Sequence, residues 1–347
     1  MSDKEIKKVD ATQMRLDLFE LDSLKDKNYS NTLEILDVSG LFTSDRRTKY
    51  LPTASANELV TRRTNNYKEL SIDYLISAAN IERETDGVKE RVFVFPGVRE
   101  ETIWEVCKKI ATNAGRGEAY EMEGNAGPGK KLVGLKVGLY EIRQEAIRLG
   151  KTYSYDEIRE GLNVLNKANL QIESDNGDIS LDGTYFPVLA MADKNNPDNT
   201  KMFICFHPMV TDVIYSLNFR RYNYLEGMKF SSLYTRTIYK RLSHRWVQAS
   251  VSNPYTILLS TLVSSMKKPA STIARDKQTF EACMNELVEA GVLDKFEMGP
   301  KKEGRKILDW VFHLHASEKF AKQMASNNKV RNNLLGADDE QAEELDL

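Results

Sequence analysis

The sequence is poor in cysteine and has no long apolar segment. Its three cysteines, Cys107, Cys205 and Cys283, lie far apart among apolar neighbours, without a CxxC spacing. This pattern excludes a disulfide framework and predicts reduced thiols in the core. No apolar run approaches the roughly 20 residues that a transmembrane helix needs. The polar start, MSDKEIKKVD, lacks the apolar core of a signal peptide and predicts a cytoplasmic protein.

Histidine is also scarce, with four in the whole chain. Two of them, His313 and His315, flank a leucine and would lie on one face of a strand. That arrangement suits a divalent metal in an enzyme that nicks DNA with a tyrosine nucleophile. No tyrosine follows Tyr255, however, and alternation is expected on any strand. We favour ordinary alternation and keep a metal-dependent nicking endonuclease for rolling-circle replication as an alternative.

One glycine-rich segment, EMEGNAGPGKKLVG at 121–134, is close to the phosphate-binding loop G-x-x-x-x-G-K-[ST]. Lys131 stands where that motif has a magnesium-binding hydroxyl, and LVGLKVG predicts an extended segment where the motif requires a helix. We therefore expect a connection between a helix and a strand, without a nucleotide site. No carboxylate pair or Ser/His/Asp arrangement stands out, so we expect no enzyme activity, no cofactor and no bound metal.

The chain does have length and segregated charge. Its 347 residues allow two domains of ordinary size, and 41% hydrophobic with 29% charged residues is typical of a globular protein. From 201 to 315, seventeen lysines and arginines face ten acids, whereas the last twelve residues, GADDEQAEELDL, contain six acids and no base. The basic block predicts that the C-terminal half binds a polyanion.

Periodicity in the first half predicts helices and hairpins. Ser154 and Glu157 form a capping box that opens a helix of about four turns, and DNG then turns a hairpin. Further elements are expected before this point: strands at 70–79 and 91–95 joined by ETDG, a helix at 99–114, a strand at 132–137 and a helix at 140–149.

A similar order is expected in the second half. A helix at 231–249 would bury Tyr234 and Ile238 while Arg236 and Lys240 point outward. A second helix at 271–290 follows KKPAS, and strands at 292–298 and 306–315 flank the turn GPKKEGR. The buried stripe of the second helix is expected to contain four residues: Ile273, Phe280, Met284 and Leu287.

Two copies of helix, turn, helix and hairpin predict an α+β fold with tandem winged-helix domains. The expected organisation is a flexible N-terminal arm at 1–43, winged helix 1 at 44–195, winged helix 2 at 196–320 and an acidic flexible tail at 321–347. Winged helix 2 is expected to be the main DNA-binding domain. In winged helix 1 the outward residues would include Asp156, Glu160, Asn163 and Lys167, whose acids would repel phosphates, so weak DNA contact or a protein interface is expected there.

The candidate DNA contacts follow from the second copy. Its last helix would enter the major groove and present Ser271, Thr272, Arg275, Lys277 and Gln278. Basic side chains around it would contact phosphates and add salt-dependent affinity. These expected wing and backbone contacts are Lys267, Lys268, Lys301, Lys302, Arg305 and Lys306.

Several segments, taken together in order, resemble the iteron-binding plasmid replication initiators of the pi type and the broad-host-range Trf type. The first-domain segments are SGLFTSDRRTKYLP and GKTYSYDEIREGLNVLNKANLQIES. The second-domain segments are FICFHPMVTDVIYS, YLEGMKFSSLYTRTIYKRLSHRW and NELVEAGVLDKFEMGPKKEGRKILDWVFHL. They span most of residues 39–314, and their shared order is more specific than any one of them.

The resemblance implies a plasmid replication initiator without enzyme activity that binds directly repeated sites, the iterons, in double-stranded origin DNA. Family members help to open the origin, recruit host initiator and helicase, and commonly repress as dimers. By position, the resemblance places the base-contacting helix from Ser271 onward and the wing at 301–306. A winged-helix transcriptional regulator is the further alternative.

The N-terminal arm contains RLDLF, which is similar to the QL[SD]LF peptide that docks on the bacterial sliding clamp, and Trf-type initiators have such a peptide. Arg15 replaces the preferred glutamine. Two apolar anchors would enter a hydrophobic pocket on the clamp. A short amphipathic helix that covers the first domain is the equal alternative. The residues of this possible clamp peptide are Leu16, Asp17, Leu18 and Phe19.

Overall fold

The structure is a computed structural model of the 347-residue chain. It describes residues 28–43, 49–50, 58–67, 69–85, 88–112, 116–121, 131–192, 196, 200–215, 218–267, 270 and 272–345. The RLDLF segment with Leu16, Asp17, Leu18 and Phe19, and the predicted DNA contacts Lys268 and Ser271, lie outside these residues. Within the described residues, no helix is both long enough and apolar enough to cross a membrane.

The fold is mixed α/β and divides into two compact units. The first unit comprises residues up to Asn31 together with Leu41–Asn218, and the second comprises Thr32–Gly40 and Phe219–Leu347. The division at 218–219 differs from the expected boundary at 195–196. The reason is that β12 (Lys201–Cys205) pairs with β8 (Lys131–Gly138), which ties it to the first unit.

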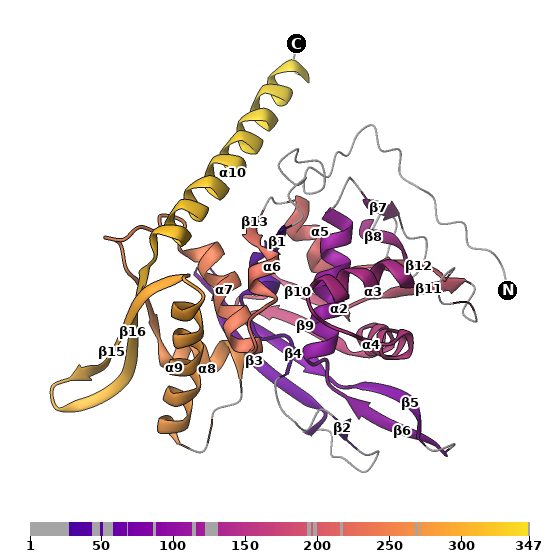
Figure 1. Ribbon diagram of the computed structural model, residues 1–347, viewed down its shortest axis with the longest axis horizontal. Coiled ribbons are helices and arrows are strands. Elements are labelled where there is room, and N and C mark those ends of the chain that lie inside the picture. The colour runs from indigo at the N-terminus through magenta and orange to yellow at the C-terminus, as the bar shows by residue number, and fades with distance from the viewer. Residues whose placement is uncertain are drawn as a thin grey trace. The chain divides into compact units, whose positions relative to one another are not determined.

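One sheet of the first unit joins strands that are far apart in the sequence (Figure 1). Its order is β10-β9-β4-β3, with β3 at Val60–Tyr67, β4 at Leu70–Ser77, β9 at Asn169–Ser174 and β10 at Ser180–Thr184. All its neighbours are antiparallel. The predicted DNG hairpin is confirmed as β9–β10, where Gly177 has φ of 79°. That conformation favours glycine because it has no Cβ.

Two further sheets complete the first unit. The order β11-β12-β8-β7 contains β7 (Gly117–Glu121) and β11 (Val188–Ala192), and the order β2-β6-β5 contains β2 (Lys49–Tyr50), β5 (Ala79–Thr85) and β6 (Val88–Val94). The ETDG turn therefore joins β5 to β6. The prediction that 70–79 is the first strand of that hairpin is wrong, because most of this segment is β4, which pairs with β3 and β9.

The predicted helices of the first unit are confirmed. They are α2 (Val98–Thr112), α3 (Leu139–Arg148) and α4 (Tyr155–Lys167), followed further along the chain by α5 (Pro208–Tyr215). A Cβ on Gly161 would lie only 2.4 Å from Ile103 Cδ1, so glycine permits the close packing of α4 on α2. Trp104 of α2 anchors an aromatic core, with its ring centroid 5.3 Å from that of Phe186 and 5.5 Å from that of Phe206.

The expectation of a flexible arm up to residue 43 is corrected from Tyr29 onward. Residues Tyr29–Leu33 form β1, which pairs with β13 (Phe219–Asn223), and Glu34–Asp37 form the short helix α1. Leu33, Leu36 and Val38 are almost completely buried. The scattered apolar residues of this polar segment therefore contribute to a core, and that burial orders the segment.

Helix α7 (Leu233–Arg245), which follows the short α6 (Tyr224–Gly227), is buried on all sides. Arg236 and Lys240 are 1% and 3% exposed, so the expectation that they point outward is wrong. The Arg236 Nε donates to the Phe230 carbonyl oxygen at 2.8 Å. Packing of α1, α9 (Ile273–Glu289) and β13 around α7 leaves it no solvated face.

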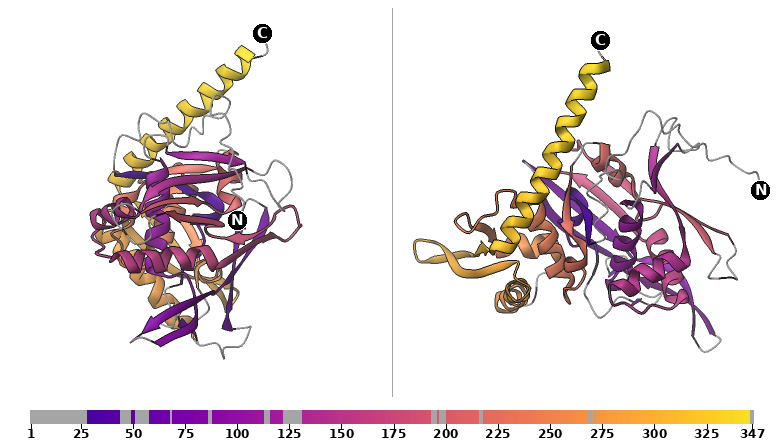
Figure 2. Two further views of the ribbon diagram at one scale, coloured as in Figure 1. Left: turned by 90° about the vertical axis from the view of Figure 1, so that its right-hand side faces the viewer. Right: turned by 45° about the horizontal axis from the view of Figure 1, so that its top comes forward.

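After α7 the order is β14 (Tyr255–Leu258), α8 (Leu259–Met266), α9, β15 (Leu293–Glu303) and β16 (Lys306–Ala316), with a sheet in the order β14-β16-β15. The β15–β16 hairpin extends beyond α8 and α9 of its own unit (Figure 1). The predicted flexible tail is instead a helix, α10 (Glu318–Leu345), which Figure 2 shows as one long helical ribbon. Its first turns bury Phe320 and Met324, which anchors it.

The expected state of the cysteines is confirmed. Cys107, Cys205 and Cys283 are free and buried. Burial raises the pKa of the Cys107 thiol and raises that of Cys205 to about 12, because the thiolate loses its solvation. The three thiols therefore serve as small apolar groups in the core.

Candidate nucleic-acid interface

Helix α9 is defined by a local cap and a buried stripe. The Thr272 hydroxyl accepts from the Arg275 N–H at 3.4 Å and closes the first turn. Phe280, Met284 and Leu287 are buried, as the sequence predicts. These contacts fix which side of the helix faces its own unit and which faces solvent.

The first turns of α9 present an exposed face. Arg275 and Gln278 are exposed, as expected, and so is Thr272. The prediction that Ile273 is buried is wrong, because its side chain is 64% exposed. The buried position in this turn belongs instead to Asp276, and the stripe begins only at Phe280.

Asp276 is held by groups from the preceding loop. Its carboxylate accepts from the Ala270 N–H at 3.2 Å and forms an ion pair with the Lys267 ammonium. The Lys267 side chain is only 13% exposed. The expectation that Lys267 contacts a phosphate is therefore corrected, because its charge is used inside the unit to fix the start of α9.

A cation–π contact links α9 to the hairpin that follows it. The Lys277 Nζ lies 3.3 Å from the centroid of the Trp310 ring, which belongs to β16. Such contacts contribute about 0.5–1 kcal/mol at exposed sites. Lys277 is half-buried, so its charge stays near the surface between the helix and the hairpin.

The wing, residues 299–308 of the β15–β16 hairpin, is basic and exposed. Gly304, with φ of 58°, turns the chain between Glu303 and Lys306, which are paired in register. Every side chain from 301 to 308 is exposed. The structure thus gathers on one hairpin tip the four predicted cations Lys301, Lys302, Arg305 and Lys306, with Glu303 as the single acid of the wing.

Two exposed apolar residues of the wing were missed by the sequence reasoning. Ile307 and Leu308 are 48% and 50% exposed. Lys302 pairs with Ile307 and Lys301 pairs with Asp309, so Leu308 has no partner in the register and forms a β-bulge. The consecutive pair Ile-Leu directly after a basic turn was the available signal in the sequence.

The His313 and His315 pair lies on β16 beside β14 and β15. The His313 Nδ1 is 3.3 Å from the Thr256 hydroxyl, and the His315 Nε2 is 3.9 Å from the Glu297 carboxylate. Glu297 also forms an ion pair with Lys295 at 2.7 Å. In the described part of the chain, no group of three or more metal-ligating side chains is found.

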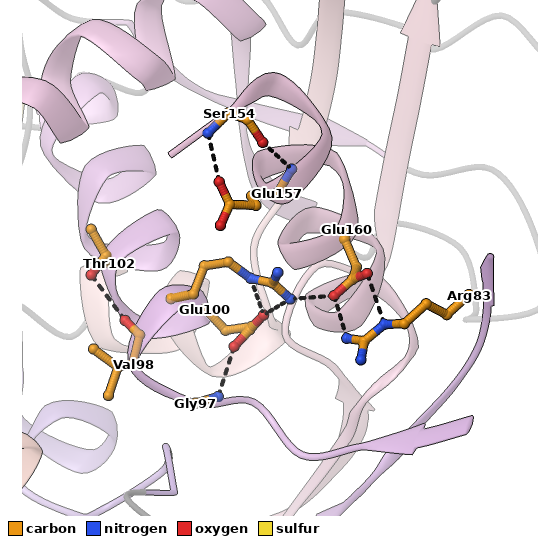
Figure 3. A network of polar contacts seen from close by, with 9 residues as sticks. Arg83, Gly97, Val98, Glu100, Thr102, Ser154, Glu157 and Glu160 are labelled. Atoms are coloured by element: carbon orange, nitrogen blue, oxygen red, sulfur yellow. Dashed lines mark hydrogen bonds and ion pairs between the residues drawn. The ribbon is translucent and has the colours of Figure 1, made fainter. Parts of the chain in front are cut away.

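The first unit contains a comparable helix and hairpin, α4 with β9–β10, whose exposed side chains differ in charge. Ser154 and Glu157 form the predicted capping box (Figure 3), with the Glu157 N–H 3.1 Å from the serine hydroxyl and the Ser154 N–H 2.8 Å from the Glu157 carboxylate. Glu160, expected to face solvent, is only partly exposed. Its carboxylate accepts from the Arg83 Nη2 at 2.6 Å and the Arg99 Nη2 at 2.8 Å.

These contacts decide the charge state of Glu160. Burial raises the pKa of its carboxyl, but the hydrogen bonds from Arg83 and Arg99 outweigh that effect, so the pKa lies below its usual value. Arg99 also donates to Glu100 at 2.8 Å, and Glu100 accepts from the Gly97 N–H at 2.9 Å. The two arginines are therefore committed to a network that joins α2, α4 and β5.

The β9–β10 hairpin is acidic throughout. From 169 to 184 it contains no lysine or arginine and four acids: Glu173, Asp175, Asp178 and Asp182. Asp156, at the start of α4, is 92% exposed and pairs with Arg159 at 3.0 Å. The outward Asp156 and this hairpin support the expectation that phosphates would be repelled here.

The segment that resembles a phosphate-binding loop, 121–134, ends in a strand and not in a helix. Residues 122–130 lie outside the described residues, and Lys131 begins β8, so the helix that the motif requires is missing after the lysine. A cavity of about 540 Å³ lies beside β8 and β12 in the first unit. Its wall includes Arg116, whose guanidinium is bound to Glu141 at 2.6 Å.

No family model matches the sequence, and neither does a curated protein. Solved structures do resemble it. A selenomethionine derivative of domains 2 and 3 of RctB aligns with a TM-score of 0.45 at 10% identity, over 82% of this chain and 96% of that chain. The Pi initiator protein in complex with iteron DNA aligns with a TM-score of 0.43 at 16% identity, over 64% of this chain and 91% of that one. A second structure of RctB domains 2–3 aligns with a TM-score of 0.41 at 10% identity, over 82% and 97%.

Proposed function

We propose that this protein is a tandem winged-helix, sequence-specific DNA-binding protein whose main reading domain is the second unit. The observation that carries the proposal is the exposed first turns of α9 beside the exposed basic wing, linked by Lys277 and Trp310. The order α7, β14, α8, α9, β15, β16 supports the winged-helix proposal, since helix, strand, helix, helix and hairpin is the order expected of that domain. In the first unit α2, β7, β8, α3, α4, β9 and β10 follow in a similar order, with two strands in place of one between the first two helices.

The two surfaces would contribute differently to DNA binding. With α9 in the major groove, Arg275 would donate two hydrogen bonds to guanine O6 and N7, and Gln278 would pair with adenine. The Thr272 side chain would contact a phosphate or a base edge at the start of the helix. The wing cations would contact phosphates, which adds affinity that depends on salt but not on sequence.

The sequence resemblance narrows this DNA-binding function to replication initiation at plasmid iterons. In this proposal the protein binds directly repeated sites in double-stranded origin DNA, helps to open the origin, and recruits host initiator, helicase and sliding clamp. Dimers would repress the protein's own gene. The protein would have no enzyme activity of its own, and the acidic surface of the first unit would give weak DNA contact or bind protein.

Selection from a random duplex pool tests the proposal. The full chain should enrich one motif, and a mobility shift with tandem copies of that motif should withstand competition from random duplex. Equal binding to motif and random DNA would overturn sequence-specific recognition. Loss of plasmid maintenance on deletion of the gene would distinguish an initiator from a transcriptional regulator, because a regulator leaves replication intact.

A further inference from the structure

The wing combines two kinds of exposed side chain, cationic and large apolar. Ile307 and Leu308 are about half exposed, and they lie among Lys301, Lys302 and Lys306. A purely phosphate-binding hairpin has no need for large apolar groups in solvent, where their exposure is unfavourable. These two residues therefore indicate a partner that has anionic groups at its surface and an apolar interior.

A β-bulge in the backbone sets the direction in which this apolar pair points. Consecutive residues of a regular strand point to opposite faces, but the bulge at Leu308 breaks that alternation. Bulges re-aim side chains and are common next to functional sites. The adjacent Asp309 is held away from the tip, because its carboxylate accepts from the Trp310 N–H at 2.7 Å and the Ser260 N–H at 3.3 Å. The tip therefore stays cationic around its two apolar residues.

We propose that Ile307 and Leu308 form an apolar wedge that enters the minor groove of duplex DNA and partly unstacks one base step, bending the duplex. The wedge rests on the proposed DNA-binding function and adds a mode of recognition to it. Apolar side chains inserted between base steps bend DNA by about 20–90°. The cations beside the pair, Lys306 on β16 and Lys301 and Lys302 on the paired β15, complement the phosphates that border the groove.

The reach of the wing fits this position. Trp310 of β16 contacts Lys277 in the first turns of α9, and Leu308 and Ile307 lie two and three residues closer to the turn, roughly 7–10 Å at 3.3 Å per residue. The major groove is about 12 Å wide. With α9 in the major groove, the apolar pair would therefore lie at the edge of that groove, next to the phosphate strand that borders the neighbouring minor groove.

The wedge also predicts a form of sequence preference without hydrogen bonds to bases. Pyrimidine–purine steps such as TA and CA unstack most easily, so insertion is most favourable there. A flexible step should therefore be found at a fixed distance from the bases that Arg275 contacts. Its replacement by a stiff A-tract should weaken binding although no base-edge contact is lost.

The test uses the full chain and a duplex carrying its selected motif, labelled at both ends for energy transfer and with 2-aminopurine at the flexible step. Wild-type protein should bend the duplex and raise the 2-aminopurine fluorescence. The double variant Ile307→Ser, Leu308→Ser should lose more than half of both signals while its affinity falls less than tenfold. The matched control is Ile147→Ser, which changes a 41% exposed isoleucine of the first unit and should leave both signals unchanged.

Three other results would overturn either the wedge or the proposed function. An unchanged bend and an unchanged 2-aminopurine signal in the double Ser variant would overturn the wedge and leave the proposed DNA-binding function standing. Failure of wild-type protein to prefer its motif would overturn the function itself. Vesicles with 30% anionic lipid test the other partner class: binding that needs Ile307 and Leu308, together with an unaffected bend, would assign the apolar pair to a lipid surface and overturn the wedge.

Discussion

The two units each contain a helix followed by a hairpin, yet the exposed start of the helix and the tip of the hairpin carry opposite charge in the two units. In the second unit, α9 exposes Arg275 and Gln278, and four cations surround the hairpin turn. In the first unit, α4 begins with the exposed Asp156, and the β9–β10 hairpin has four acids and no base. Backbone order alone therefore does not decide what a helix and hairpin bind.

The comparison also shows how arginines are used differently. Arg83 and Arg99 of the first unit are bound to Glu160, so their charge is neutralised within the fold. In the second unit the acid near the start of α9, Asp276, is buried against Lys267 and leaves the exposed face cationic. The placement of the acids therefore leaves the start of α9 cationic, whereas the start of α4 exposes Asp156.

Of the substitutions considered, Arg275→Ala should reduce DNA affinity the most. If Arg275 makes two hydrogen bonds to a guanine, its loss should cost about 1–3 kcal/mol on the selected motif and relax one base position. Mobility-shift titrations with the motif and its single-base variants measure both effects. Arg159→Ala, on α4 of the first unit, is the matched control, and an equal loss in both variants would remove the distinction between the units.

The pair Lys301→Ala, Lys302→Ala should weaken binding to all duplexes to a similar degree. Loss of two phosphate contacts should flatten the slope of log affinity against log salt by about one to two. Titrations at several salt concentrations measure the slope. Lys295→Ala is the control from the same strand, because Lys295 is already paired with Glu297. A slope that does not change would show that the wing lies away from the phosphates.

Glu160→Gln should destabilise the first unit by about 1 kcal/mol, since Arg83 and Arg99 lose a charged acceptor within a partly buried network. The pKa of Glu160 is lowered in the folded state, so its stabilisation is present above the unfolded value near 4.5 and is lost as pH falls through the folded pKa. Hydrogen exchange of the α4 amides at several pH values measures this. The difference between wild type and variant should shrink toward low pH, whereas a constant difference would contradict the ionic role.

The smallest expected effect concerns the link between α9 and the wing. A double-mutant cycle of Lys277→Met and Trp310→Leu should give a coupling energy of about 0.5–1 kcal/mol in urea unfolding, because the cation–π contact is near the surface. Additive single effects would show that the helix and the wing are held together by the sheet alone.

Local features were predictable from the sequence. The capping box at Ser154, the helix 155–167, the hairpin around Gly177 and the basic hairpin around Gly304 are all observed. Each depends on hydrogen bonds or backbone angles within a few residues, so a short segment contains the whole signal. The candidate DNA contacts Arg275 and Lys301 lie where the sequence predicts, one in the first turns of a capped helix and the other beside a tight turn.

Features that depend on distant partners were not predictable. Arg236 has the helical spacing of an outward residue but is buried because other elements cover α7 on every side. The sequence predicts that Lys267 binds phosphate, because its ion pair with Asp276 forms only when the loop packs against the start of α9. The pairing of β4 with β9 likewise joins segments about a hundred residues apart, and neither strand specifies the other by its own pattern.

The sequence by itself determined where helices and tight turns begin and that positive charge gathers in the second half, since these follow from neighbouring residues and from composition. Only the tertiary structure decided which charged side chains reach solvent. Exposure is set by what packs around an element, and those partners come from remote parts of the chain. That is why Arg275 and Arg236, both basic residues on helices of the same unit, end in opposite environments.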